Sequence, residues 1–182
     1  MPPSPTITAD SQDETQIKPF ILYISGSDTR SKVLDISRSD VNILMAVNPQ
    51  AKQVLLLNTP RDYYVKNPAG SGAYDKLTHL GIYGLDCSMK GLGNLYGVDV
   101  DYYAQINFTG FETLIDAIGG ITVNSDEAFS AGGYDFVEGP NEMNGAKALA
   151  FARDRHHQAS GDNARGKHQM MVIEAMIFLS DI

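Results

Sequence analysis

The sequence predicts an α/β domain in which helices cover a sheet. Short apolar runs rich in branched residues recur along the 182-residue chain, and longer segments with helical spacing lie between and after them. Strands and helices mixed over one length of chain are typical of a sheet packed against helices. A chain of this length is one domain's worth and can bury a sizeable core.

Four short apolar runs predict buried strands, because each is strand-sized and bounded by turn residues. A further strand and a β excursion are expected over residues 121–139, with Gly132 and Gly133 at the turn of the excursion. The four runs are Phe20–Ile24, Val41–Val47, Val54–Leu57 and Tyr102–Ile106.

Four segments carry helical patterns. Leucines recur at helical spacing over residues 77–96, although four glycines weaken this prediction. Residues 110–118 have one apolar face, and Gly119-Gly120 is a helix stop signal. Helices are also expected over residues 141–152 and 163–180.

Composition bounds the organisation and the partners. Residues 1–19 are rich in proline and polar residues and are expected to be a flexible lead-in to a domain over residues 20–182. The balance of 14 basic against 22 acidic residues gives a net charge of -8, which argues against nucleic-acid binding because that affinity comes from neutralising phosphates. No apolar run approaches the ~20 residues of a membrane helix, so the chain as given is expected to be soluble. A single cysteine, Cys87, excludes an internal disulfide framework and a multi-cysteine zinc site.

The placement of arginine is the most informative feature. All six arginines lie beside loop signals at the ends of predicted elements, whereas the lysines are spread along the chain. Guanidinium groups that converge repel one another unless an anion lies between them, and their planar fork matches phosphate oxygens. The alternative is that each arginine pairs with a nearby aspartate, and the candidates are Asp28, Asp40, Asp62, Asp154 and Asp162. The six arginines are Arg30, Arg38, Arg61, Arg153, Arg155 and Arg165.

Two further spacings support an anion site. Arg165 and Gln169 are four residues apart and are expected on one helix face. Asp28 and Asp40 flank the segment that carries Arg30 and Arg38, and carboxylates beside a polyphosphate site are the usual anchors of Mg²⁺. Turn chemistry is the alternative explanation for these aspartates.

At these residues the sequence resembles the LytR–CpsA–Psr family of bacterial cell-wall enzymes. The resemblance runs from about Phe20 to the end of the chain, and it depends on six short motifs in the family's order. They are Gly26–Arg30 (GSDTR), Arg38–Asp40 (RSD), Thr59–Asp62 (TPRD), Asp75–His79 (DKLTH), Gly119–Val123 (GGITV), and a tail of Phe151–Arg155 (FARDR) followed by Gly161, Asp162, Arg165 and Gln169.

The resemblance implies a three-layer α-β-α fold with a central mixed sheet, and a specific reaction. Members of the family transfer a glycopolymer from an undecaprenyl-pyrophosphate carrier onto peptidoglycan, by family likeness onto the muramic acid 6-hydroxyl. They are anchored by an N-terminal membrane helix, here absent from the chain, with the catalytic domain at the extracellular face of the bacterial membrane. The wording of the motifs favours capsular polysaccharide as the polymer, and a pyrophosphatase side activity is expected.

Carried over residue by residue, the resemblance assigns roles to eleven positions. Asp28 and Asp40 would hold Mg²⁺ as the metal ligands. Arg30, Lys76 and Gln169 would help to bind phosphate. The catalytic group would comprise Arg38, Arg61, Arg153, Arg155 and Arg165, which grip the pyrophosphate, and Asp162, which orients the last loop.

Several questions stay open at this point. The family often has an arginine where this chain has His168, and further helix and strand are expected beyond Ile182, so the domain is interpreted as shortened at its C-terminus. Asp62 and Asp162 are both candidates for the general base. Apolar residues of 77–95 and 170–179 either line a slot for the lipid tail or form an ordinary core.

Three other functions compete with this interpretation. A non-catalytic module that binds polyprenyl phosphates would need the same arginines. Transcriptional control is disfavoured by the net charge and by the lack of a helix-turn-helix signal. A metallohydrolase would use His156, His157 and His168.

Overall fold

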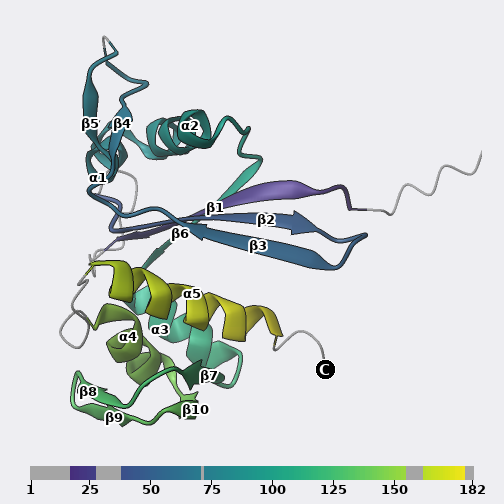
Figure 1. Cartoon of the computed structure of the whole chain (residues 1–182), viewed down its shortest axis with the longest axis vertical. Helices are drawn as coiled ribbons and strands as arrows, with labels where there is room; N and C mark the ends of the chain where they lie inside the picture. Colours follow the sequence, from purple (N-terminus) through teal and green to yellow (C-terminus); the bar gives the residue numbers. More distant parts are fainter. Residues whose placement is uncertain (1–16, 28–37, 71, 155–161, 179–182) are drawn as a thin grey trace, which may run out of the picture.

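A four-stranded mixed sheet forms the centre of the molecule, with the strand order β3-β2-β1-β6 (Figure 1). The computed structural model describes residues 17–27, 38–70, 72–154 and 162–178. Strands β1, β2 and β3 pair antiparallel, while β6 runs parallel to β1. Each of the four strands predicted from apolar runs lies inside an observed strand. These are β1 (Phe20–Ser27), β2 (Val41–Asn48), β3 (Gln53–Asn58) and β6 (Tyr102–Asn107).

Helices α1 (Leu77–Leu80) and α2 (Leu85–Tyr96) and a hairpin of β4 (Tyr64–Lys66) and β5 (Tyr74–Lys76) form the layer above the sheet in Figure 1. The expectation of one helix over 77–96 is wrong in its continuity. A 3₁₀ turn, Gly81–Tyr83, follows α1, and Gly84 then adopts a φ of +101°, which a helix cannot contain. Glycine at this position permits the break.

Helices α3 (Phe108–Ala117), α4 (Gly145–Arg153) and α5 (Asp162–Phe178) form the layer below the sheet (Figure 1). They pack with β7 (Ile121–Ser125), which pairs with β10 (Gly139–Met143), and with the hairpin of β8 (Phe129–Ala131) and β9 (Tyr134–Phe136). The predicted turn of the β excursion at Gly132-Gly133 is confirmed, since it joins β8 to β9. No helix within the described ranges is long and apolar enough to cross a membrane.

The helix predicted over 141–152 begins too early. Residues 141–143 belong to β10, because they pair with β7, and long-range pairing of this kind leaves no periodic signal in the local sequence. Helix α4 starts after Asn144, whose side chain accepts a hydrogen bond from the backbone N–H of Lys147 at 2.9 Å. Asn144 is thus an N-cap that the sequence pattern could have indicated.

The three layers create two separate cores. Above the sheet, Tyr23 and Leu44 pack with side chains of α1, α2 and β4. Below it, the core is formed by α3, α4, α5 and the small strands, with Phe151 at its centre. The three-layer α-β-α architecture with a central mixed sheet is therefore confirmed. The predicted lead-in stays a prediction, because residues 1–16 lie outside the described part of the chain.

His168 is a core residue of the lower layer. Its ring is only 2% exposed and stacks on Phe129, with ring centroids 5.1 Å apart and planes 4° from parallel. The Phe151 ring packs against the His168 ring, with ring centroids 4.5 Å apart. This setting disfavours His168 as a metal ligand, and the two other histidines of the metallohydrolase alternative, His156 and His157, lie outside the described residues.

Burial lowers the pKa of His168 below its usual value of 6.5, which makes stability depend on pH. As the pH falls through 6.5, the unfolded chain takes up a proton at this ring while the folded chain does not, so stability is lost. We expect the Tm to fall by roughly 3 °C more between pH 7.5 and 5.5 in the wild type than in His168→Gln. Thr113→Ala, at an exposed uncharged side chain of α3, is the control and should keep the wild-type slope. Equal slopes in wild type and His168→Gln would contradict the assignment.

Candidate functional site

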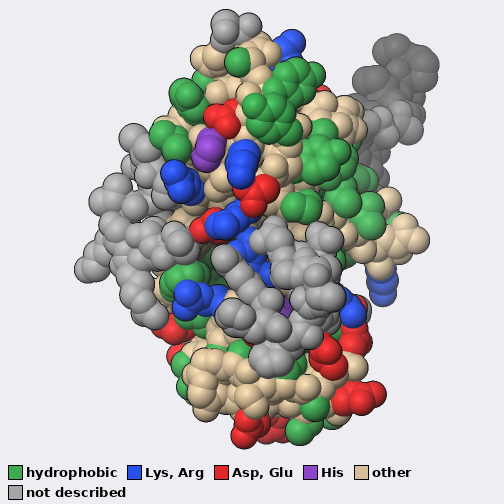
Figure 2. Space-filling model, turned by 60° about the vertical axis from the view of Figure 1, so that its left-hand side comes forward, with side chains coloured by type: hydrophobic (Ala, Val, Ile, Leu, Met, Phe, Trp, Pro, Cys, Tyr) green, Lys and Arg blue, Asp and Glu red, His purple; other side chains and the backbone are tan. Residues whose placement is uncertain are grey.

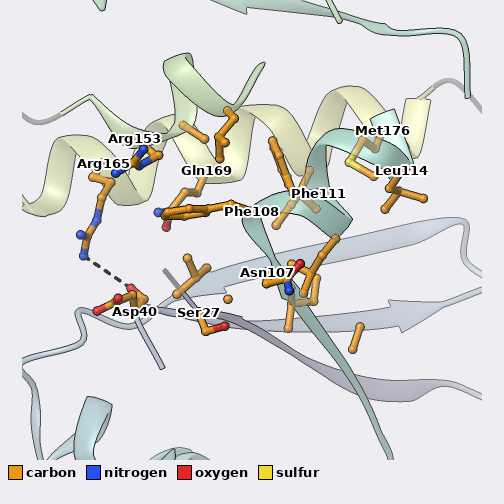
Figure 3. Close-up of a pocket in the computed structure, with 18 of the residues that line it drawn as sticks. Ser27, Asp40, Asn107, Phe108, Phe111, Leu114, Arg153, Arg165, Gln169 and Met176 are labelled. Atoms are coloured by element: carbon orange, nitrogen blue, oxygen red, sulfur yellow. Dashed lines mark hydrogen bonds between the residues drawn. The ribbon is translucent and has the colours of Figure 1, made fainter. Parts of the chain in front are cut away.

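A cavity of about 840 Å³ lies between the sheet and the lower helices (Figure 3). Strands β1, β2 and β6 supply one wall, and helices α3, α4 and α5 supply the other. Most of its lining is apolar. The apolar side chains nearest the sheet are Leu22, Ile24, Met45, Ala104 and Ile106, and those of the helices include Phe108, Phe111, Leu114, Ile173, Met176 and Ile177.

The cavity follows from the alternation of side chains along β1. Tyr23 points up into the core with α1 and α2, so Leu22 and Ile24, one residue either side, point down into the cavity. A strand covered on both faces has apolar residues on both, which is why the run Phe20–Ile24 reads as continuously hydrophobic. The lower face of the sheet is therefore apolar where the helices stand away from it.

The same distinction answers the question about the lipid slot. Among the two candidate segments, Ile173, Met176 and Ile177 of α5 line the cavity. Leu77, Leu80 and Leu92 are instead fully buried in the upper core. The leucines of segment 77–95 therefore form ordinary core, whereas side chains of segment 170–179 line the cavity.

One end of the cavity is polar. Asp40, Arg153, Arg165 and Gln169 line this end, with Ser27 and Asn107 nearby (Figure 3). Arg153 lies over the ring of Phe108, with its guanidinium carbon 4.4 Å from the ring centroid. Within the part of the chain that the structure describes, the buried hydroxyl of Ser27 has no hydrogen-bond partner. An apolar chamber with guanidinium groups at one end suits an amphipathic ligand with an anionic head.

Arg165 is held at this end by the packing of α5 on the sheet. Its neighbour Gly166 lies so close to the Asn58 side chain at the end of β3 that a Cβ would clash there. Arg165 is 5% exposed, and its Nη2 donates to the backbone oxygen of Asp40 at 3.4 Å (Figure 3). Gln169, one turn later, lines the same cavity, which confirms that the two residues share a helix face.

Asp40 links the cavity to Arg61. Nη1 of Arg61 donates to Oδ1 of Asp40 at 2.6 Å, so the ion-pair alternative weighed from the sequence applies to this arginine. Ser39, the residue before Asp40, is held by its side chain, since its hydroxyl lies 2.9 Å from the Tyr23 hydroxyl. Tyr23 also donates to Asn42 at 2.7 Å. This buried network positions Asp40, whose carboxylate accepts from Arg61 and whose backbone oxygen accepts from Arg165.

Lys76 and Asp62 extend the polar cluster outward. Nζ of Lys76 donates to Oδ1 of Asp62 at 2.7 Å, and Nε of Arg61 lies 3.7 Å from the other oxygen. The hydrogen bond from Lys76 lowers the pKa of Asp62 below its usual range. A carboxylate whose charged form is stabilised in this way is a weak proton acceptor, which disfavours Asp62 as the general base.

The structure thus brings together six of the eleven predicted site residues. Asp40, Arg153, Arg165 and Gln169 line one cavity, Arg61 contacts Asp40, and Lys76 adjoins Arg61 through Asp62. Arg38 is exposed and is not part of the cavity wall. Outside the described residues lie Asp28, Arg30, Arg155 and the side chain of Asp162.

Some residues of the site were missed. Ser27, Asn107 and Phe108 line the cavity, and the sequence analysis assigned none of them a role in this site. Asn107 caps α3 by accepting from the backbone N–H of Gly110 at 2.8 Å. An asparagine before an amphipathic helix is a start signal, so the sequence could have placed this residue at the carboxyl end of β6.

The fold and the cavity define a three-layer α/β domain with an apolar chamber that has arginine side chains at one end. The LytR_cpsA_psr family model matches residues 4–179, and the chain belongs to this family. That match confirms the family resemblance found in the motifs. It also includes most of the segment expected to be a lead-in.

Named relatives and solved structures agree with this membership. The chain is 38% identical over 161 residues to the polyisoprenyl-teichoic acid–peptidoglycan teichoic acid transferase TagU of Oceanobacillus iheyensis, a match to 85% of this chain and 49% of that protein. The crystal structure of Bacillus subtilis TagU is similar with a TM-score of 0.72 and 36% identity, over 88% of this chain and 66% of that one. The chain therefore spans about half the length of the curated relatives it matches.

A third similar structure contains a ligand. It is the family protein TagT with bound octaprenyl pyrophosphate lipid, 31% identical with a TM-score of 0.73, over 90% of this chain and 65% of that one. That lipid consists of a long apolar prenyl chain and a pyrophosphate group.

Proposed function

We propose that this domain is a phosphotransferase that moves a glycopolymer from a polyprenyl-pyrophosphate carrier, undecaprenyl pyrophosphate, to peptidoglycan. The observation that carries the proposal is the cavity with an apolar body and an arginine end. A prenyl chain would occupy the body, where each buried CH₂ contributes about 0.8 kcal/mol. The pyrophosphate would lie against Arg153 and Arg165. The lipid bound to TagT and the transferase names of the relatives support this assignment.

The chemistry follows from the charge of the pyrophosphate. An acceptor hydroxyl attacks the phosphorus that carries the glycopolymer, a new O–P bond forms, and the bond to the lipid phosphate breaks with its electron pair leaving on that phosphate. Charge spreads over the phosphate oxygens as this happens, and fixed guanidinium groups stabilise it. Asp162 takes the hydroxyl proton in this proposal, since Asp62 is committed to Lys76.

Mg²⁺ is proposed as the cofactor, with Asp40 and Asp28 as its protein ligands. The described residues offer Asp40 and the buried hydroxyl of Ser27 at the polar end, and hard oxygen ligands of this kind fit the ion. They do not form a cluster of three ligating side chains among themselves, but Mg²⁺ usually takes one or two carboxylates and fills the rest with water and phosphate. When bound, it would neutralise charge on the phosphate oxygens.

The polymer, the anchoring and the location are further parts of the proposal. The relatives named above act on teichoic acid, and a teichoic acid is therefore proposed ahead of the capsular polysaccharide that the motifs favoured. Capsule stays a prediction that a polymer-specific transfer assay would settle. We place the domain at the extracellular face of the bacterial membrane, anchored by a segment outside this chain.

The proposal is tested by phosphate release from geranylgeranyl pyrophosphate, measured with Mg²⁺ and with EDTA. We expect release that EDTA abolishes, and an Asp40→Asn variant whose release needs at least about tenfold more Mg²⁺. Asp126→Asn, at an exposed aspartate of the lower layer, should titrate like the wild type. An unchanged metal titration in Asp40→Asn would remove this residue from the metal site. Tight lipid binding without release would favour the non-catalytic binding module instead.

A further inference from the structure

The outer surface of the β4–β5 hairpin, in the upper layer, exposes tyrosine side chains beside lysine side chains. Tyr64 is directly opposite Lys76, and Lys66 is directly opposite Tyr74. Opposed residues of a hairpin share a face, and so do residues two apart, so these four side chains stand together. We call them the tyrosine–lysine face. Val65, between them in sequence, points the other way into the upper core and is 2% exposed.

The aromatic side chains of this face are exposed. Tyr64 and Tyr74 are 63% and 60% exposed, although large aromatic side chains are usually buried. Their ring centroids lie 6.2 Å apart with planes only 13° from parallel, so the two rings are stacked against each other. Exposed aromatic rings stack on the flat faces of ligand rings, and their hydroxyls remain available to polar partners.

The face is continuous with the candidate active site. Lys76 contacts Asp62, and Asp62 adjoins Arg61, which is bound to Asp40 at the polar end of the cavity. Figure 2 shows hydrophobic side chains over the upper part of this side of the molecule, with a band of basic and acidic side chains below them. A ligand on the hairpin would therefore reach the arginines without crossing the sheet.

The charges around the face favour a sugar chain over a membrane surface. The face carries only two lysines, and the charge of Lys76 is compensated by Asp62. Attraction to anionic lipid needs clusters of about 4–8 uncompensated Lys or Arg residues. Pyranose rings have apolar faces and hydroxyl groups at their edges. Exposed aromatic rings can stack on those faces, while neighbouring charged side chains hydrogen-bond to the hydroxyl groups.

The position of the hairpin identifies which sugar chain it would hold. The prenyl chain of the proposed donor occupies the cavity below the sheet, whereas the hairpin packs above it (Figure 1). In phosphoryl transfer the attacking and leaving oxygens are roughly in line, so the acceptor approaches from the side opposite the departing lipid phosphate. We propose that the tyrosine–lysine face binds the acceptor, a peptidoglycan glycan strand, an assignment that rests on the proposed function.

Binding of peptide-free peptidoglycan glycan strands, measured by calorimetry, tests this inference. We expect the double variant Tyr64→Ala/Tyr74→Ala to bind them at least about tenfold more weakly than the wild type. Tyr64→Phe/Tyr74→Phe keeps the rings and should retain most of the affinity. Tyr103→Ala, at a tyrosine of β6 that is 57% exposed, is the matched control and should bind normally.

Three outcomes would overturn the assignment. Absence of glycan binding by the wild type, or unchanged binding by the double alanine variant, would remove the acceptor from this face. Binding to anionic vesicles that the alanine variant alone loses, with glycan binding intact, would make the face a membrane contact.

Lipid binding separates this inference from the proposed function. All four proteins should bind geranylgeranyl pyrophosphate equally, because the tyrosines do not line the cavity. A parallel loss of lipid binding in the alanine variant would indicate general damage and would count against a specific glycan surface. A wild type that binds glycan through the tyrosines but binds no prenyl pyrophosphate would leave a glycan-binding surface and overturn the proposed function.

Discussion

Arg165→Ala is expected to reduce phosphate release from geranylgeranyl pyrophosphate by about 10²- to 10³-fold. The side chain is buried at the polar end of the cavity, where a guanidinium group faces the proposed position of the pyrophosphate in a site that excludes most water. Release and binding should both be measured, because the loss of a group that stabilises developing charge lowers the rate more than the affinity.

Lys167→Ala is the matched control for that variant. Lys167 lies two residues further along α5, is exposed and pairs with Asp126. Its substitution by alanine removes a positive charge from the same helix without changing the cavity. It should keep the wild-type rate. A Tm loss in Arg165→Ala large enough to unfold the protein at the assay temperature would instead assign Arg165 a mainly structural role. Full activity in Arg165→Ala would contradict the proposed site.

Ala104→Trp is expected to weaken geranylgeranyl pyrophosphate binding by about a hundredfold. Ala104 pairs with Ile24 in the parallel ladder and lines the apolar body of the cavity, so a large ring there takes space that the prenyl chain would fill. Inorganic pyrophosphate, which has no tail, should bind to the variant and the wild type equally. Titration of both ligands separates the contribution of the tail from that of the head.

Tyr103→Trp provides the control, since residue 103 is adjacent in the strand and its side chain points to the opposite face. The tryptophan side chain then lies outside the cavity. If Ala104→Trp bound the prenyl ligand as tightly as the wild type did, the tail would not lie in this cavity.

Much of the fold could be predicted because local patterns specify it. Each predicted strand lies inside an observed one, and the stop signal at Gly119-Gly120 follows α3 directly. One error arose from a long-range contact and the other from a local break in the backbone. Residues 141–143 form a strand only because β7 is beside them, and the helix after Leu77 breaks at Gly84, where the backbone leaves the helical region.

The site was predictable in its residue types and less so in its pairings. The spacing of Arg165 and Gln169 placed them on one face correctly. Spacing could not show that Arg61 pairs with Asp40, 21 residues earlier, because that contact depends on β2 and β3 lying side by side. The spacing of apolar residues also could not show which helix faces a cavity. Helices that line a core and helices that line a cavity have the same hydrophobic periodicity, and they differ only in how closely the opposite layer approaches.

The cavity beneath the sheet also means that apolar side chains on the lower face of the sheet are not packed against the helices. Leu22 and Ile24 have the side-chain chemistry of interior residues, yet they face an open chamber rather than the helices below. A prenyl chain in that chamber would serve as the missing interior layer, packed between sheet and helices as a side chain would be. Binding of the carrier would then complete the packing between the sheet and the lower helices. Release of the spent carrier would leave these apolar side chains uncovered again.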